Sequence, residues 1–195
     1  MLETTKVMID SEVFSEIKHE LLNLEETEGV RILYALESGS RAWGFPSRDS
    51  DYDVRFVYIH PCEWYLSVDL ESKRDVIERP ISGSFDFDGW DIRKALKLFA
   101  KSNPPLLEWL DSSIVYLDRF ALAERLRSMR AAFFSPQACA YHYLHMAQGN
   151  YRTYLRGARV WLKKYFYRPR VDQAQLNDIF RTCLHVAWDS NRDQF

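Results

Sequence analysis

Two short apolar runs, separated by a polar segment rich in turn residues, constrain the fold of this chain more than any other feature. The first run is VRILYAL (30–36), which is followed by Ser38-Gly39-Ser40. The second is YDVRFVYI (52–59), which is rich in β-branched and aromatic residues and is closed by Pro61. Runs of this length and composition predict β-strands. We therefore expect a sheet in the N-terminal half of the chain.

The remaining periodicity predicts further strands and several helices. Apolar residues recur at helical spacing after Ser11, and prolines open two later segments at Pro104 and Pro136. We predict helices at 11–25, 91–101, 104–110 and 136 to about 167, and strands at 75–78 and 84–88. This pattern indicates an α+β fold, with a sheet-containing domain over residues 1–112 and a helical lobe over residues 113–195.

Composition excludes several classes of protein. Of the 195 residues, 47% are hydrophobic and 28% are charged, so the chain can bury a core and is not disordered. Its apolar runs are short and broken by charges, which predicts no membrane span. The N-terminus has no basic segment followed by an apolar one, so no secretory signal is expected. Three scattered cysteines argue against a disulfide framework and fit a reducing compartment. We expect a cytoplasmic protein without a membrane partner.

Charge is distributed unevenly along the chain. The formal net charge is only −2, yet residues 125–171 contain ten Lys or Arg and no Asp or Glu. Such a basic segment suits an anionic ligand such as a nucleotide or RNA, and it is equally common as a solvated surface. Four of its cations share one stripe at 100° per residue, and we expect this stripe to bind phosphate or an acceptor: Arg152, Arg156, Arg159 and Lys163.

The segment between the first two strands has the residues that a phosphate and metal site requires. Gly39-Ser40 follows a strand, where free backbone N–H groups can hold phosphate oxygens and glycine permits close approach. Ten residues then separate Ser40 from Asp51. Asp51 and Asp53 are two residues apart, so on a strand both carboxylates would point to the same side. Two adjacent carboxylates favour a hard cation such as Mg²⁺.

A third carboxylate is expected from a later strand. The candidate is the run SFDFD (84–88), in which Asp86 has apolar neighbours on both sides and Asp88 shares its face. Both remain candidates at this point. Asp91 is instead predicted to be the first-turn acid of the following helix, where the helix dipole favours a negative charge.

In combination these motifs resemble a known family. A strand, Gly-Ser, a spacer and Asp-x-Asp form the signature of nucleotidyltransferases of the DNA polymerase beta superfamily. ESGSRAWGF, SDYDVRF, GWDIRKAL, SNPPLLEWL and GNYRTYL are similar to segments of the bacterial nucleotidyltransferases associated with RNA repair. The resemblance covers residues 30–167 approximately. The tail after Tyr167 departs from it.

The resemblance implies a minimal nucleotidyltransferase fold, two Mg²⁺ ions (Mn²⁺ being an alternative) and transfer of a nucleotidyl group from an NTP to an acceptor hydroxyl, with RNA as a candidate acceptor. By carry-over, Asp51 and Asp53 would bind metal, and Gly39 and Ser40 would hold the triphosphate. Asp86 would supply the third carboxylate, with Asp88 as its competitor.

Two arginines near these motifs are further candidate site residues, and two alternative functions are considered after them. Arg41 belongs to the glycine-serine motif and is expected to bind nucleotide. Arg55 shares the face of Asp53, where it can contact a phosphate or form an ion pair with the aspartates. Two alternatives to the transferase remain open: a non-catalytic nucleotide- or RNA-binding module of the same fold, and an enzyme that transfers AMP to a protein.

Overall fold

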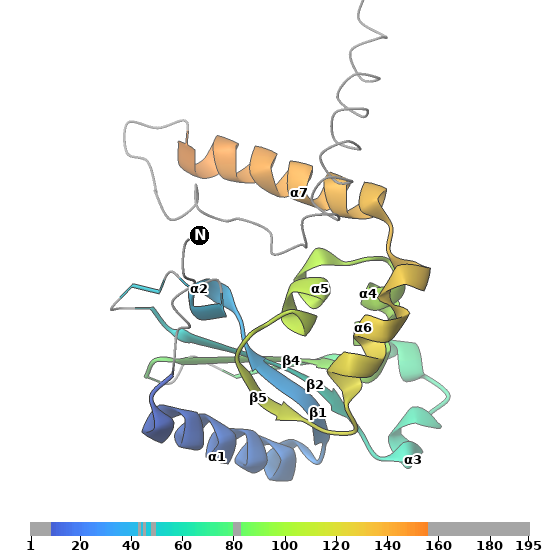
Figure 1. Ribbon diagram of the computed structural model, residues 1–195. Coiled ribbons are helices and arrows are strands. Elements are labelled where there is room, and N and C mark those ends of the chain that lie inside the picture. Colours follow the sequence, from blue (N-terminus) through green and yellow to red (C-terminus); the bar gives the residue numbers. More distant parts are fainter. Residues whose placement is uncertain (1–8, 43, 45, 48–49, 80–82, 156–195) are drawn as a thin grey trace, which may run out of the picture. The chain divides into compact units, whose positions relative to one another are not determined.

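The computed structural model describes residues 9–42, 44, 46–47, 50–79 and 83–155 (Figure 1). The chain divides into two compact units. The first comprises Met1–Lys97 and Trp109–Arg130, and the second comprises Leu98–Glu108 and Ala131–Phe195. The predicted boundary at residue 112 stays a prediction, since much of the predicted helical lobe lies outside the described residues.

The first unit contains a five-stranded mixed sheet, which confirms the α+β class. The strands are β1 (Arg31–Glu37), β2 (Tyr52–Ile59), β3 (Val76–Glu78), β4 (Phe85–Asp91) and β5 (Val115–Asp118). Their order across the sheet is β3-β4-β2-β1-β5. β2 and β4 are parallel, whereas the other three neighbouring pairs are antiparallel.

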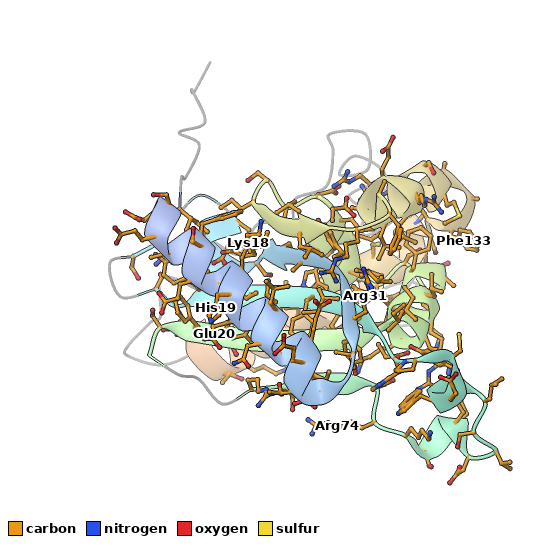
Figure 2. All side chains as sticks on the ribbon, turned by 90° about the horizontal axis from the view of Figure 1, so that it is seen from below. Lys18, His19, Glu20, Arg31, Arg74 and Phe133 are labelled. Atoms are coloured by element: carbon orange, nitrogen blue, oxygen red, sulfur yellow. The ribbon has the colours of Figure 1, made fainter. Side chains whose placement is uncertain are left out.

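Helix α1 (Ser11–Glu28) covers one face of this sheet, as Figure 1 shows. Asp10 caps the start of the helix, where its side chain accepts from the Glu12 N–H (2.8 Å). Gly29 caps its end with a left-handed backbone conformation. Three of its apolar residues are buried against the strands, whereas Lys18 and His19 remain exposed (Figure 2). The core between helix and sheet includes Ile17, Leu21, Leu24, Ile32, Val54, Phe56, Tyr58, Ile77 and Phe87.

The sequence predicted some of these elements and missed others. The bounds predicted for β2 and for α5 (Pro104–Leu110) are those observed, and α1 extends three residues beyond its predicted end. β4 is longer than predicted and gives way to α4 (Ile92–Ala100) at Asp91. The elements that were not predicted are α3 (Cys62–Tyr65), a 3₁₀ turn (Leu70–Ser72), β5 and α6 (Leu122–Phe133).

In the second unit, α7 (Pro136–Asn150) begins as predicted, with the Ser135 side chain accepting from the Ala138 N–H. Ser102 joins the segments of this unit: its hydroxyl donates to the Phe133 carbonyl (2.8 Å) and accepts from the Ser135 N–H (2.7 Å). A π-helical turn (Tyr151–Leu155) follows α7. A π turn alters the angular spacing of side chains, so the 100° spacing assumed for the predicted stripe does not apply at Arg152.

Two expectations fall wholly or partly outside the described residues. Arg152 is exposed and lies in the π-helical turn, whereas Arg156, Arg159 and Lys163 lie outside the described part of the chain, as does the tail after Tyr167. Among the described helices, none combines the length and the apolar character needed to cross a bilayer.

Candidate active site

The parallel pairing of β2 with β4 places Asp53 beside Asp86. The two residues are register partners, and parallel partners project to the same face of a sheet. That face is the one opposite α1, because the alternate residues Val54 and Phe56 belong to the core under the helix. The sheet thus brings together two carboxylates that are 33 residues apart in the sequence.

Arg55 connects these two carboxylates. Its Nη2 lies 3.1 Å from Asp53 Oδ1 and 2.8 Å from Asp86 Oδ2, and its Nη1 donates to the Asp86 carbonyl (3.0 Å). Only 16% of the Arg55 side chain is exposed. Of the two interpretations of Arg55 from the sequence, this is the ion pair. Arg55 thus forms ion pairs with both carboxylates at once. Two neighbouring negative charges need such a counter-ion.

Gly39 lies directly against the Asp53 carboxylate. A Cβ at Gly39 would be 1.8 Å from Asp53 Oδ2, which no side chain could occupy without displacing the aspartate. The backbone φ of Gly39 is +57°, a left-handed conformation that favours glycine. The Ser38 N–H also donates to the Asp53 carbonyl (2.8 Å). The Asp53 carboxylate therefore fills the space that a side chain at the start of α2 (Gly39–Ala42) would need.

Ser40 and Arg41 hold the segment that leads into β2. The buried Ser40 hydroxyl donates to Ser50 Oγ (3.2 Å), which also accepts from the Ser47 N–H (2.9 Å). Arg41 donates through Nη2 to the Ser50 carbonyl (2.7 Å) and stacks over the Tyr52 ring at 3.8 Å. Ser40 and Arg41, two of the four predicted nucleotide-binding residues, thus contact the same loop. Contact of these residues with a nucleotide stays a prediction.

Glu37 is a buried carboxylate behind this site that the sequence analysis did not select. It is fully buried, and its Oε1 accepts from the Asp53 N–H (3.1 Å) while its Oε2 accepts from the Tyr116 hydroxyl (2.7 Å). Burial raises the pKa of Glu37 to about 7, and the two hydrogen bonds partly oppose that rise. Glu37 therefore fixes the backbone of Asp53 from the core side.

Asp51 and Asp88 occupy different environments from the Asp53–Asp86 pair. Asp51 precedes β2 by one residue and is exposed, and its carbonyl accepts from Arg41 Nε (3.3 Å). Asp88 pairs in register with Arg55, one pleat further along β4. Its Oδ1 is buried without a hydrogen-bond partner among the described residues, and burial raises its pKa. Asp86, not Asp88, is thus level with Asp53.

The donor atoms at this site suit a hard cation. Within the described residues, no group of three or more His, Cys, Asp or Glu side chains is arranged to hold a metal ion by itself. Mg²⁺, however, is commonly bound through one or two carboxylates together with substrate phosphates and water. The converging oxygens of Asp53 and Asp86, with the unpartnered oxygen of Asp88 behind them, fit such an ion. Arg55 now occupies the position between the first two.

Of the site residues that the sequence analysis missed, only Glu37 has a recognisable signal in the sequence. Glu37 ends an apolar strand run, and a charged residue in that position indicates a buried or functional carboxylate. Its partner Tyr116 lies on β5, a strand that the sequence analysis did not find. Ser50, the hydrogen-bond partner of Ser40, has no distinguishing pattern.

Comparison with known proteins agrees with this geometry. A family model described as "RNA repair pathway DNA polymerase beta family" (RlaP) matches residues 13–176. The chain is also similar to YcgL of Bacillus subtilis (strain 168), described as an uncharacterized protein, with 58% identity over 148 residues. That match covers 76% of this chain and 56% of YcgL, so the chain spans little more than half the length of this relative.

Proposed function

Since the chain belongs to the RNA repair pathway DNA polymerase beta family, we propose that it is a Mg²⁺-dependent nucleotidyltransferase acting on an NTP. The observation that carries the proposal is the pairing of Asp53 with Asp86 on adjacent parallel strands, directly beside the backbone of Gly39. A carboxylate pair next to a glycine turn is what a metal-held triphosphate requires.

In the proposed reaction, an acceptor hydroxyl attacks the α-phosphorus of the NTP. A new phosphorus–oxygen bond forms, the bond to pyrophosphate breaks with its electron pair going to the leaving group, and the hydroxyl proton passes to water. Asp53 and Asp86 would hold Mg²⁺, with Asp51 and Asp88 as further candidate ligands. When bound, Mg²⁺ supplies positive charge that offsets the triphosphate and the developing negative charge of the transition state.

The chain's own residues would position these groups. Glu37 holds the Asp53 backbone from the core side, and Gly39 leaves room for the Asp53 carboxylate. Arg55 offsets part of the negative charge of Asp53 and Asp86 before substrate arrives. It can then turn its guanidinium toward a phosphate, for which its planar donors are well suited. Pre-positioned groups of this kind contribute to rate because they need no reorganisation during the reaction.

The experiment is a transfer assay with each α-labelled NTP, Mg²⁺ and a pool of small RNAs. We expect label to pass to an acceptor with release of pyrophosphate. Asp53→Asn should lower the rate by about a thousandfold or more, the scale expected when a charge essential to the transition state is lost. Asp69→Asn is the matched control, since Asp69 is exposed and lies outside the site; its rate should not change.

Three outcomes of this assay distinguish the alternatives. NTP binding without transfer would identify a nucleotide-binding module and reject the transferase. Label found on protein instead of RNA would keep the chemistry and replace the acceptor. Equal rates for Asp53→Asn and the wild type, with both folded by circular dichroism, would remove Asp53 from the active site.

The acceptor is proposed to be RNA on two grounds. One is the family to which the chain belongs, and the other is the cation-rich segment 125–171. Neutralising phosphates with Lys or Arg makes binding dependent on salt. Binding of a labelled small RNA should therefore weaken steeply between low and moderate salt. Arg152→Gln should reduce that salt slope while leaving the melting temperature unchanged.

A further inference from the structure

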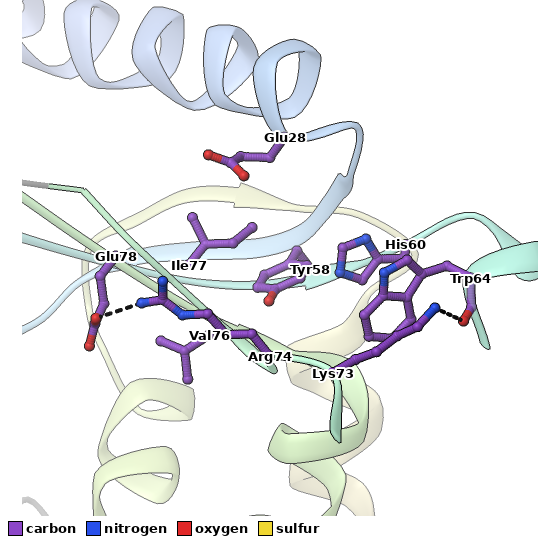
Figure 3. Close-up of a pocket in the computed structure, with 9 residues that line it drawn as sticks. All are labelled: Glu28, Tyr58, His60, Trp64, Lys73, Arg74, Val76, Ile77 and Glu78. Carbon is purple, nitrogen blue, oxygen red and sulfur yellow. Dashed lines mark hydrogen bonds and ion pairs between the residues drawn. The ribbon is translucent and has the colours of Figure 1, made fainter. Parts of the chain in front are cut away.

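A cavity lies at the end of β2 remote from Asp53, and two of its lining residues, Tyr58 and Ile77, belong to the core under α1. It has a volume of about 400 Å³, which is within the usual range for small-molecule sites. Figure 3 shows its lining, which is drawn from β2, α3 and β3 and their flanking residues. The lining residues used below are Tyr58, His60, Trp64, Lys73, Val76 and Ile77.

One wall of this cavity is aromatic and rigid. The His60 and Trp64 rings stack at 3.9 Å with an angle of 12°, and Tyr58 meets the His60 ring edge-on at 5.4 Å. Lys73 donates to the Trp64 carbonyl (3.1 Å), and its ammonium lies 4.6 Å from the centroid of the Trp64 ring. Burial lowers the pKa of His60, so its imidazole is neutral near pH 7. Val76 and Ile77 add an apolar surface.

The hydroxyl of Tyr58 lies among the lining side chains of the cavity, as Figure 3 shows. Tyr58 is only 1% exposed, and its hydroxyl makes no hydrogen bond to any described residue. A hydroxyl without a protein partner is free to hydrogen-bond to water or to a ligand. A ligand with an acceptor atom in the cavity would satisfy it.

The charges around the cavity leave one cation available. Glu28 pairs with Arg79 (2.9 Å) and Glu78 pairs with Arg74 (2.8 Å). Among the described residues, Lys73 has no carboxylate within ion-pair distance, and an ammonium has two further donors once the Trp64 carbonyl is bound. The cavity thus offers an aromatic wall, one hydroxyl donor and one unpaired ammonium.

We propose that this cavity binds a nucleotide unit, with its base against the aromatic wall and its phosphate at Lys73. A base supplies a planar surface that can pack against the edge of this aromatic wall and acceptor atoms for the Tyr58 hydroxyl, and the phosphate supplies the anion. The site is separate from the acidic one: Tyr58 is five residues beyond Asp53, about 17 Å along an extended strand, and lies on the opposite face. The nucleotide unit can be a free mononucleotide or part of an RNA strand.

Calorimetric titration of the intact protein tests the proposal. The two probes are adenosine 5′-monophosphate and single-stranded hexa-adenylate, with a chelator present so that no Mg²⁺ loads the acidic site. Lys73→Gln should weaken binding by about tenfold or more, since a charge-assisted hydrogen bond is lost. Tyr58→Phe should weaken it by about threefold. Lys97→Gln is the matched control, because Lys97 is an exposed lysine outside the cavity; it should have no effect.

The outcomes separate this site from the proposed active site and separate its two sources of ligand. Binding of the monophosphate that Lys73→Gln weakens and Asp53→Asn does not would support a free nucleotide. The same pattern with the hexamer alone would support an RNA strand. The proposal is overturned if neither probe binds, if Lys73→Gln and Lys97→Gln behave alike, or if Asp53→Asn removes the binding.

Discussion

Two glycines make close contacts with side chains of β2, one on each face of the β2–β4 pair, but the side chains that they contact differ. Gly39 lies against the Asp53 carboxylate, on the face opposite α1. Gly89 lies against the Phe56 ring, on the face under α1, where an added Cβ would be 2.0 Å from Phe56 Cε2. The same steric requirement therefore serves a charged group on one face and a packed ring on the other.

The comparison indicates that one face of the sheet carries the hydrophobic core and the other carries the candidate active site. Under α1, Val54 and Phe56 are fully buried in an apolar core. On the opposite face, Asp53 and Arg55 of the same strand are partly exposed and paired. Alternation along one strand keeps the two functions 180° apart. Changes on the first face should therefore unfold the protein, and changes on the second should inactivate it.

Gly39→Ala should have the largest effect on activity. The added Cβ would displace the Asp53 carboxylate, and a misplaced catalytic group costs on the order of a hundredfold to a thousandfold in rate. Gly29→Ala is the matched control, since Gly29 has a similar φ of +63° but no atom within 4 Å of the added Cβ. Both variants should lose about 1 kcal/mol of stability, measured by denaturant unfolding. Only Gly39→Ala should lose transfer in the NTP assay.

A result in which both glycine variants keep full transfer would break the comparison. It would mean that the contact between Gly39 and Asp53 has no part in the reaction.

Gly89→Ala should show the converse. Gly89 is the register partner of Phe56, which is fully buried, so the ring cannot move away without disturbing the core. Overpacking of this severity should destabilise the protein by about 3 kcal/mol. The rate per folded molecule should remain close to that of the wild type. Urea unfolding measures the first quantity, and transfer normalised to the folded fraction measures the second. Inactivation of fully folded Gly89→Ala would show that the faces are coupled.

The sequence predicted those parts of the fold that local patterns determine. The bounds of β2 and α5 and the starts of α1 and α7 agree with runs of apolar residues, prolines and capping side chains. β5 was missed because it is only four residues long and is held by pairing with β1, which local sequence does not reveal. Asp91 was predicted to be the first-turn acid of the following helix, but it is the last residue of β4, and α4 has no acid in its first turn. From this position its side chain accepts from the Arg93 N–H.

The candidate site, too, was predicted from the sequence only where local patterns determine it. The Gly-Ser and Asp-x-Asp motifs identified Gly39 and Asp53, which the structure brings together. The choice between Asp86 and Asp88 depends on the register of β4 against β2, and register is set by long-range packing. Asp51 was expected on the strand with Asp53, but the strand begins one residue later. The ligand role of each aspartate stays a prediction.

Glu37→Gln should change how stability depends on pH. Burial raises the pKa of Glu37 from 4.5 to about 7 in the folded protein, so the folded state holds a proton that the unfolded state releases. Wild-type stability should therefore fall as pH rises from about 4.5 to about 7, by at most about 3 kcal/mol. Removing this group removes that slope. In urea unfolding, the free energy of unfolding of Glu37→Gln relative to that of the wild type should be higher at pH 8 than at pH 5.

The control for this prediction is Glu63→Gln, since Glu63 is exposed on α3 and far from the core. Parallel pH profiles for Glu37→Gln and the wild type would show that Glu37 keeps the same charge across this range. Its contact with the Asp53 N–H would then hold the site together at any pH.

Arg55→Gln should have the smallest effect, and it tests whether Arg55 offsets the negative charges of Asp53 and Asp86. Without metal, Asp53 and Asp86 would face each other with no cation between them, so the melting temperature should fall by an amount equivalent to about 1 kcal/mol. Mg²⁺ with NTP should then stabilise this variant more than the wild type, because no guanidinium has to be displaced. Arg79→Gln, which breaks the exposed pair with Glu28, should show no such gain. Thermal melting with and without Mg²⁺ separates the cases. An equal shift in Arg55→Gln and the wild type would mean that the cation binds elsewhere, and that Arg55 is a permanent part of this face.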